Sequence, residues 1–279
     1  MIETLEDFHV RIWEGNNKCY ALSKQSNWHK IFPSDSLQKV FWKNSDQTLY
    51  KSNFSEIKNS FFEDDLPMVR YSKSDKIGYL NITRFELKFG ANLKSSDSKQ
   101  LSELMDKIVD DFKGVNVIII DLRSCMGGWP EYGEIVASRL TKEKRHYATT
   151  VKFKTAKDSL APVKHYIKPD GPQQLNVPVI ILTNKVVRSA AEDFILMLKQ
   201  LPNVYIIGEP TWGAFAESDM HKLSNGWKVQ YSNQKVYSPN GETYEGKGIP
   251  VDLRIDNTWE NIVNKNDAVI EAAILYSKK

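Results

Sequence analysis

A serine among small residues, Ser189, stands where a predicted strand and loop give way to a predicted helix. The surrounding segment, 184–192, reads NKVVRSAAE. At the start of a helix the helix dipole and unpaired N–H groups favour negative charge, so this hydroxyl can act as a nucleophile and the Ala190 amide can bind an oxyanion. An ordinary N-cap serine, with Glu192 completing a capping box, explains the same residues, and residue types alone favour that simpler interpretation.

Two adjacent glycines, Gly127 and Gly128, follow a predicted core strand that ends in the residues DLR at 121–123. Glycines after a core strand allow backbone N–H groups to point into a cleft, which is what stabilising a developing oxyanion requires. Glycines are also the usual residues of a strand-to-helix turn, where they only relieve strain. Taken alone, the pair favours the turn.

His9 is the candidate general base. Side chains alternate from Phe8 to Trp13, which predicts a strand and puts His9 on one defined face. A general base must come within hydrogen-bond reach of the nucleophile, and His9 is so distant from Ser189 in sequence that only the fold can join them. A lone histidine on a strand is more often structural. Glu245 can orient a catalytic histidine, although its residue type alone favours a solvated side chain.

The elements that must position these residues follow from the hydrophobic pattern. Three apolar runs lack alternation, as strands buried on both faces do: 115–122, 177–183 and 204–208. Apolar residues recur at helical spacing in three segments: 101–112, 190–201 and 267–277. Strand, helix and strand in this order imply right-handed crossovers and a largely parallel sheet. We therefore predict a mixed α/β (α+β) fold, with a small N-terminal region at 1–76 that carries His9 and a catalytic core at 77–279.

Composition excludes several classes of protein. The 279 residues include 38 Lys and Arg against 35 Asp and Glu, and the net charge of +3 is not gathered into a basic run, so we expect no nucleic-acid partner. The apolar runs are too short to span a bilayer, and the first residues show no signal peptide, as in a chain whose leader has been removed. Cys19 and Cys125 form neither a metal-binding spacing nor a disulfide framework.

Taken together, these segments resemble the tail-specific, or C-terminal-processing, serine peptidases and their tricorn-core relatives. The resemblance covers most of the chain from Ile77 to Asp252, with the motifs in the family's order. The motifs are a strand at 77–80, DLR…GG at 121–128, N…SAAE at 184–192, GE-T-G at 208–213 and Y-P-G…G-G-I-D at 237–252. The resemblance implies a ClpP/crotonase-like core, a peptide or protein substrate, and no metal or organic cofactor.

The resemblance assigns roles to the residues of these motifs. It carries the nucleophile over to Ser189 and the oxyanion donors to Gly127 or Gly128 and to Ala190. Three aromatic residues close to the motifs are the candidates for binding the substrate side chain: Trp129, Trp212 and Phe215.

The general base depends on the branch of the family. C-terminal-processing members use a lysine shortly after GE-T-G, but Ala214 occupies that place here. The tricorn-like branch uses a histidine in a context like L-x-D-x-H-V, which residues 5–10 fit, so the resemblance makes His9 the base. In that branch a serine precedes the histidine and a late glutamate completes the site. Phe8 replaces that serine, and Glu245 is the predicted glutamate.

Other expectations come from family habit. Many relatives carry a PDZ domain between the histidine segment and the first core strand, but residues 14–76 are too few for one, so we predict none. By analogy with the family, we expect an exported bacterial protein, either periplasmic or extracellular. A homo-oligomer is also possible by this analogy.

Two other function classes remain open. Folds related to these peptidases also carry apolar ligands, and Phe8 in place of serine suits a decayed site that binds an apolar ligand or peptide without hydrolysis. A crotonase-type acyl-CoA enzyme shares the oxyanion glycines but does not explain the Ala-Ala-Glu or the His9 segment. An α/β-hydrolase is excluded because no G-x-S-x-G surrounds Ser189. We predict a serine peptidase, endopeptidase or carboxyl-terminal processing, that works through a Ser189 acyl-enzyme with His9 as the base.

Overall fold

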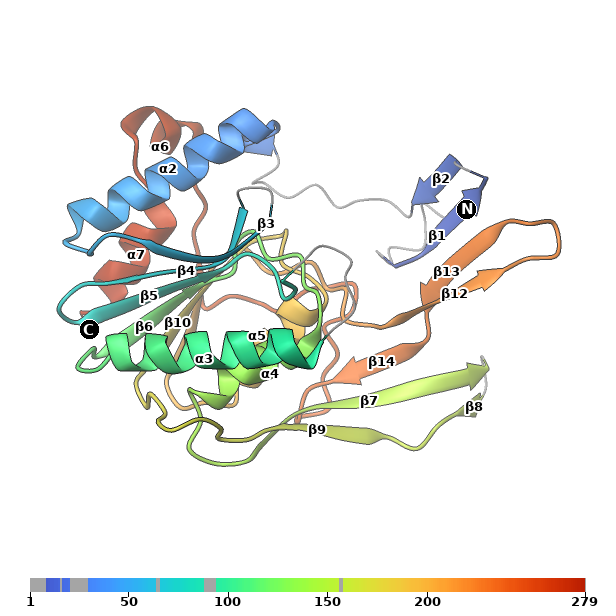
Figure 1. Cartoon of the computed structure of the whole chain (residues 1–279). Coiled ribbons are helices and arrows are strands. Elements are labelled where there is room, and N and C mark those ends of the chain that lie inside the picture. The colour runs from blue at the N-terminus through green and yellow to red at the C-terminus, as the bar shows by residue number, and fades with distance from the viewer. Residues whose placement is uncertain are drawn as a thin grey trace.

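The structure, a computed structural model, describes residues 9–15, 17–20, 30–63, 66–87, 94–155 and 158–278. Among these residues a seven-stranded sheet with the order β15-β11-β10-β6-β5-β4-β3 forms the centre of the molecule (Figure 1). Its strands are β3 (Lys58–Glu63), β4 (Leu66–Lys73), β5 (Ile77–Ile82), β6 (Val117–Asp121), β10 (Val179–Thr183), β11 (Val204–Gly208) and β15 (Leu253–Arg254). The five strands from β15 to β5 are parallel, whereas β4 and β3 add antiparallel pairs at one edge.

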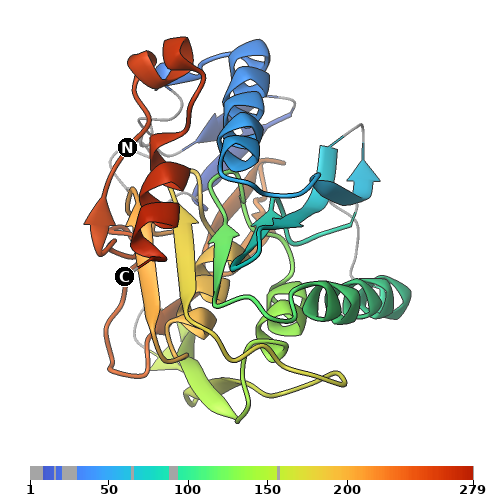
Figure 2. The same ribbon diagram turned by 90° about the vertical axis from the view of Figure 1, so that its left-hand side faces the viewer.

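Helices cover both faces of this sheet, which explains why its central strands are apolar throughout. One face carries α3 (Ser95–Asp111), α4 (Pro130–Ser138) and α5 (Ala190–Leu198), and the other carries α2 (Asp35–Lys51) and α7 (Ala268–Tyr276) (Figures 1 and 2). In β6, Ile118 and Ile120 pack with Phe194 of α5, whereas Val117 and Ile119 pack with Ile270 of α7. The predicted α/β fold with a largely parallel sheet and crossover helices is confirmed.

The boundary predicted after residue 76 falls in the turn between β4 and β5. These two strands pair over their length, with Val69 opposite Ile82. Val69 is buried in the core under α3 to α5, and Leu49 of α2 is buried in the core under α7. Residues 30–73 therefore contribute a helix and two strands to the same sheet and cores as the residues that follow.

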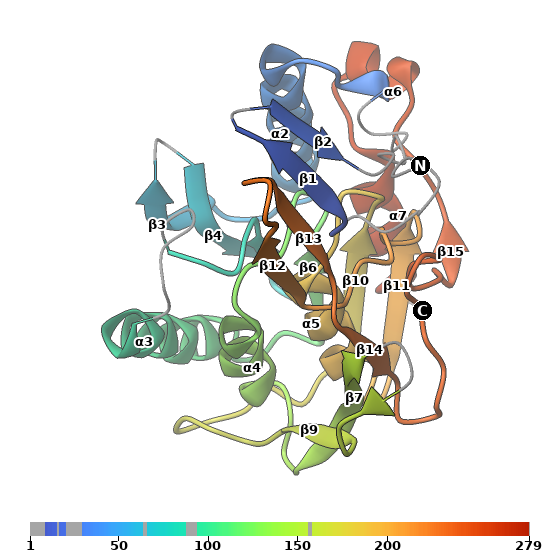
Figure 3. The same cartoon turned by 90° about the vertical axis from the view of Figure 1, so that its right-hand side faces the viewer.

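Two smaller sheets project from one side of the central sheet (Figures 1 and 3). The first has the order β12-β13-β1-β2, from β12 (Ser218–Lys222), β13 (Lys228–Ser232), β1 (Arg11–Glu14) and β2 (Asn17–Tyr20). The second joins β14 (Gln234–Tyr237), β8 (Asp158–Ser159) and β9 (Val163–Ile167) to the long β7 (Arg145–Thr155). Because Arg11 of β1 lies opposite Gln230 of β13, the first described residues reach the part of the chain that follows α5.

The strand predicted from Phe8 to Trp13 is shorter in the structure. It begins at Arg11, so His9 lies in a turn just before the strand, and Phe8 lies outside the described residues. The remaining helix is α6 (Trp259–Asn264). In the part of the chain that the structure describes, no helix has the length and apolar character needed to cross a membrane.

Candidate active site

Ser189 has a backbone conformation that side-chain-bearing residues rarely adopt. Its φ is 56° and its ψ is −136°, at the N-terminus of α5. Such conformations cost about 1–3 kcal/mol and persist only where the surroundings impose them, typically at functional sites. The Ser189 side chain makes no hydrogen bond that caps the helix, and its backbone N–H donates to the carbonyl of Ala214 at 2.9 Å. The structure therefore contradicts the N-cap interpretation of this serine.

Glu192 is not a capping-box partner either. Its carboxylate accepts hydrogen bonds from the Thr211 hydroxyl and from the backbone N–H groups of Gly213 and Ala214, the latter two at 2.7 Å. Burial raises the pKa of Glu192 to about 7. The carbonyl of Ala214 also accepts the hydrogen bond from the Ser189 N–H. The Glu192 carboxylate therefore fixes the loop that holds the strained backbone of Ser189.

The first glycine of the predicted pair lies directly against the serine, and the second lies against Phe85. A Cβ atom added to Gly127, whose φ is 100°, would lie 2.8 Å from the Cβ of Ser189 and 3.1 Å from the nitrogen of Ala190. A Cβ on Gly128 would lie 2.2 Å from the carbonyl oxygen of Phe85. Only glycine fits at either position, and the fold brings together the residues that the motifs single out.

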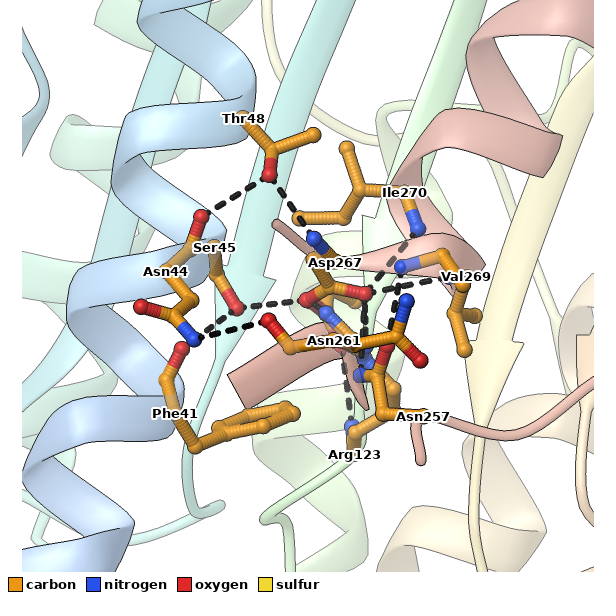
Figure 4. A network of polar contacts seen from close by, with 12 residues as sticks. Phe41, Asn44, Ser45, Thr48, Arg123, Asn257, Asn261, Asp267, Val269 and Ile270 are labelled. Atoms are coloured by element: carbon orange, nitrogen blue, oxygen red, sulfur yellow. Dashed lines mark hydrogen bonds and ion pairs between the residues drawn. The ribbon is translucent and has the colours of Figure 1, made fainter. Parts of the chain in front are cut away.

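A buried ion-pair network holds the segment that leads to these glycines (Figure 4). The Arg123 guanidinium donates to both carboxylate oxygens of Asp121, at 2.9 and 2.7 Å, and to Asp267 at 2.9 Å. Asp267, at the start of α7, also accepts from the Ser45 hydroxyl of α2 at 2.6 Å. Burial raises the pKa of Asp267, but the Arg123 charge and the hydrogen bonds from Arg123, Ser45 and Asn257 together hold it below its ordinary value. The network ties α2 and α7 to the segment 121–128.

A cavity of about 630 Å³ opens beside Ser189. Six of the predicted site residues line it: His9, Gly128, Trp129, Ser189, Ala190 and Phe215. The wall facing them comes from the second small sheet, with Thr150 of β7, His165 of β9 and Val236 of β14. The His9 side chain is buried there, only 8% exposed. The histidine nearest the start of the described chain and the candidate nucleophile thus share one cavity.

Of the three predicted site residues outside the cavity lining, Gly127 lies against Ser189 and the other two lie farther off. Trp212 is buried behind the nucleophile: its backbone N–H donates to Val187 at 2.8 Å, and its ring lies 5.8 Å from the guanidinium carbon of Arg188. It is not among the described residues that line the cavity. Glu245 is also outside the lining, but its carboxylate accepts from the backbone N–H groups of Phe215 and Ala216, at 3.0 and 3.1 Å. Glu245 therefore anchors the segment that borders the cavity.

Four acidic residues that none of the sequence motifs indicates also line the cavity: Glu131, Glu134, Asp193 and Glu217. The sequence could have indicated one of them, because Asp193 lies in the first turn of the helix that Ser189 precedes. Among the described residues no group of three or more His, Cys, Asp or Glu side chains is arranged to hold a metal ion.

The chain belongs to peptidase family S41, whose family model matches residues 76–255. It is 26% identical over 211 residues to the carboxy-terminal processing protease CtpA of Bacillus subtilis. This match covers 75% of this chain and 42% of that protein. It is 27% identical over 190 residues to a CtpA-like serine protease of Staphylococcus aureus, covering 67% of this chain and 35% of the relative. The chain thus spans less than half the length of these curated relatives.

Solved structures share the fold. A protein from Parabacteroides merdae superposes with a TM-score of 0.71 at 24% sequence identity, covering 98% of this chain and 78% of that one. Mature CPAF superposes with a TM-score of 0.61 at 16% identity, covering 80% of this chain and 53% of that one. At these identities the likeness shows a common fold.

Proposed function

We propose that this chain is a serine peptidase in which Ser189 forms the acyl-enzyme. The observation that carries the proposal is the strained backbone of Ser189. Ser189 lies against Gly127, and it lines a cavity that His9 also lines. A hydroxyl that does not cap its own helix is available for chemistry at the positive end of α5. Membership of peptidase family S41 supports the same reaction.

The reaction follows from the roles of these side chains. His9 takes the hydroxyl proton as the Ser189 oxygen attacks the peptide carbonyl carbon, and the carbonyl oxygen becomes an oxyanion. Collapse of the tetrahedral intermediate breaks the C–N bond, and the leaving amine takes the proton from His9. Water then attacks the ester with His9 again as the base, which releases the acid and regenerates Ser189.

Two backbone amides serve as the oxyanion donors in this proposal. The carbonyl of Gly127 accepts from the N–H of Phe85 at 2.7 Å, and in a trans peptide the next N–H points the opposite way. The N–H of Gly128 therefore points away from Phe85, on the side where Gly128 lines the cavity. The N–H of Ala190, the first residue of α5, supplies the second donor. Loss of one such donor typically lowers turnover about 100-fold or more.

Glu245 and the aromatic residues have supporting roles in the proposal. By accepting from Phe215 and Ala216, Glu245 positions a segment of the cavity wall. In this proposal it also orients His9. Trp129 and Phe215 offer apolar surface to the substrate side chain. The substrate is a peptide or protein, and the relatives named for carboxy-terminal processing support cleavage near a protein C-terminus.

Fluorophosphonate labelling tests the proposal. We expect an adduct at Ser189, located by mass spectrometry after digestion, that disappears in Ser189→Ala. Ser95→Ala is the matched control, because Ser95 is exposed at the start of α3, and it should label like the parent protein. A folded protein that takes no label, or that takes it on another serine, would contradict the proposal and favour a binding module of the same fold.

A further inference from the structure

The cavity beside Ser189 has charge of one sign. Four acidic side chains line it, Glu131, Glu134, Asp193 and Glu217, and no lysine or arginine is among the described residues of its lining. Its two histidines are His9 and His165. Because acids surround a space with low-dielectric walls, the field inside the cavity attracts cations.

Asp193 is the acid closest to the proposed chemistry. It lies four residues after Ser189, in the first turn of α5, and both residues line the cavity. Its side chain is neither fully buried nor exposed, and in the part of the chain that the structure describes no hydrogen bond or ion pair involves its carboxylate. Burial, and then the neighbouring carboxylates beginning with Glu192, raise the pKa of Asp193. A cation beside Asp193 would reverse this effect.

The other three acids are less suited to a specific contact. Glu134 accepts a hydrogen bond from the Tyr147 hydroxyl at 3.2 Å. The Glu217 side chain is 68% exposed and lies 3.7 Å from the Lys152 ammonium, so water screens it. Glu131, in the first turn of α4, is exposed. Asp193 is therefore the acidic residue of the lining whose carboxylate can bind a group in the cavity without competition from another side chain of the protein.

We propose that Asp193 selects a cationic side chain of the substrate, a lysine or arginine within one residue of the scissile bond. Trp129, Phe215 and Val236 line the same cavity and would contact the apolar stem of such a side chain, while its ammonium or guanidinium group reaches the carboxylate. The assignment of the bond to be cleaved rests on the proposed function of Ser189. The free N-terminus of a peptide has the same positive charge as a lysine side chain, so the test must distinguish these two sources of the charge.

Pairs of peptides test this selection. The two peptides of a pair are N-acetylated and identical, except that one contains lysine where the other contains Nε-acetyllysine. Both peptides of a pair compete in one reaction, and mass spectrometry quantifies their products. The product amounts give the ratio of the two kcat/KM values. We expect a preference for lysine of about tenfold or more, falling to near one in Asp193→Asn. Asp75→Asn, an exposed acid in the turn before β5, is the matched control and should leave the ratio unchanged. Glu217→Gln should change it by less than about threefold.

Three results would overturn the proposal. One is a parent protein that cleaves both members of each pair equally, and another is a preference that survives in Asp193→Asn. The third is a preference for peptides with a free N-terminus over the acetylated ones, which would assign the cation to the chain terminus. Fluorophosphonate labelling at the parental rate checks that Asp193→Asn is folded.

A binding measurement separates this proposal from the peptidase assignment. Fluorescence polarisation of the same peptide pairs with Ser189→Ala reports recognition without cleavage. Tighter binding of the lysine peptide by about tenfold or more, lost when Asp193→Asn is added, supports the selection even if no hydrolysis is found. Equal binding of both peptides contradicts it even if hydrolysis is found.

Discussion

Replacement of Gly127 by alanine perturbs the proposed oxyanion hole from within. A Cβ atom there would lie 2.8 Å from the Cβ of Ser189, 2.9 Å from the carbonyl oxygen of Arg188 and 3.1 Å from the nitrogen of Ala190. Two of these three atoms belong to the backbone, so the clash cannot be relieved by rotating a side chain. Either the glycine segment or the turn that carries the nucleophile must move.

The structure separates two costs of this substitution. The φ of 100° costs an alanine about 1–2 kcal/mol of stability. Displacement of an oxyanion donor lowers turnover about 100-fold or more. Gly114→Ala has the first cost without the second, because Gly114 also has a positive φ, 86°, but no atom lies within 4 Å of its added Cβ.

The assay compares kcat on a peptide substrate with thermal unfolding for both variants. We expect a larger loss of thermal stability in Gly127→Ala, because its Cβ also clashes, and a loss of kcat of about 100-fold or more only in Gly127→Ala. If Gly127→Ala kept kcat within about threefold of Gly114→Ala while remaining folded, the inference that this glycine segment forms the oxyanion hole would be refuted.

Three further predictions follow from the site. His9→Ala should slow fluorophosphonate labelling by about 100-fold or more while the thermal unfolding temperature stays close to that of the parent, and labelling at the parental rate would exclude His9 as the base. Arg123→Met leaves buried carboxylates without their cation and should lower the free energy of unfolding by about 3–5 kcal/mol in urea titrations. Lys113→Met, which loses an ion pair to Asp110 that is exposed on both sides, should cost less than about 1 kcal/mol. The pKa of Glu192 rises from 4.5 to about 7 on folding. Between pH 4.5 and 7 the Glu192 carboxyl is therefore protonated in the folded state and ionised in the unfolded state. The free energy of unfolding consequently falls as the pH rises from 4.5 to 7. Glu192→Gln should show a shallower slope in urea titrations between pH 4.5 and 7, and an unchanged slope would contradict this assignment.

The central strands and helices were predictable because their patterns are local. The run at 115–122 contains β6, and the apolar stripe at 190–201 contains α5. Both elements bury every or nearly every residue, so hydrophobicity alone identifies them. The residues from 15 to 65 show no clean hydrophobic period, and within them α2 buries polar side chains on its inner face. Asn44, Ser45 and Thr48 are buried there, and Ser45 bonds to Asp267 of α7, a partner that no local pattern indicates.

The site was predictable in its motifs but not in its contacts. The nearness of Gly127 to Ser189 depends on the parallel pairing of β6 with β10, which delivers both loops to the same edge of the sheet. Trp212 was chosen for its closeness in sequence to a motif, yet it packs beside Arg188, outside the described lining of the cavity. Asp193 went unnoticed because an acid in the first turn of a helix is ordinary, and its place on the wall of a cavity depends on β7, β9 and β14.

A crystal structure of the fluorophosphonate adduct tests the acyl-enzyme chemistry at Ser189 directly. We predict a phosphorus atom bonded to the Ser189 oxygen, with the phosphonyl oxygen about 2.7–3.1 Å from the amide nitrogens of Gly128 and Ala190 and the His9 ring within hydrogen-bond reach of the Ser189 oxygen. A phosphonyl oxygen turned away from both amides, or His9 withdrawn from an adduct at Ser189, would contradict the proposed acyl-enzyme chemistry.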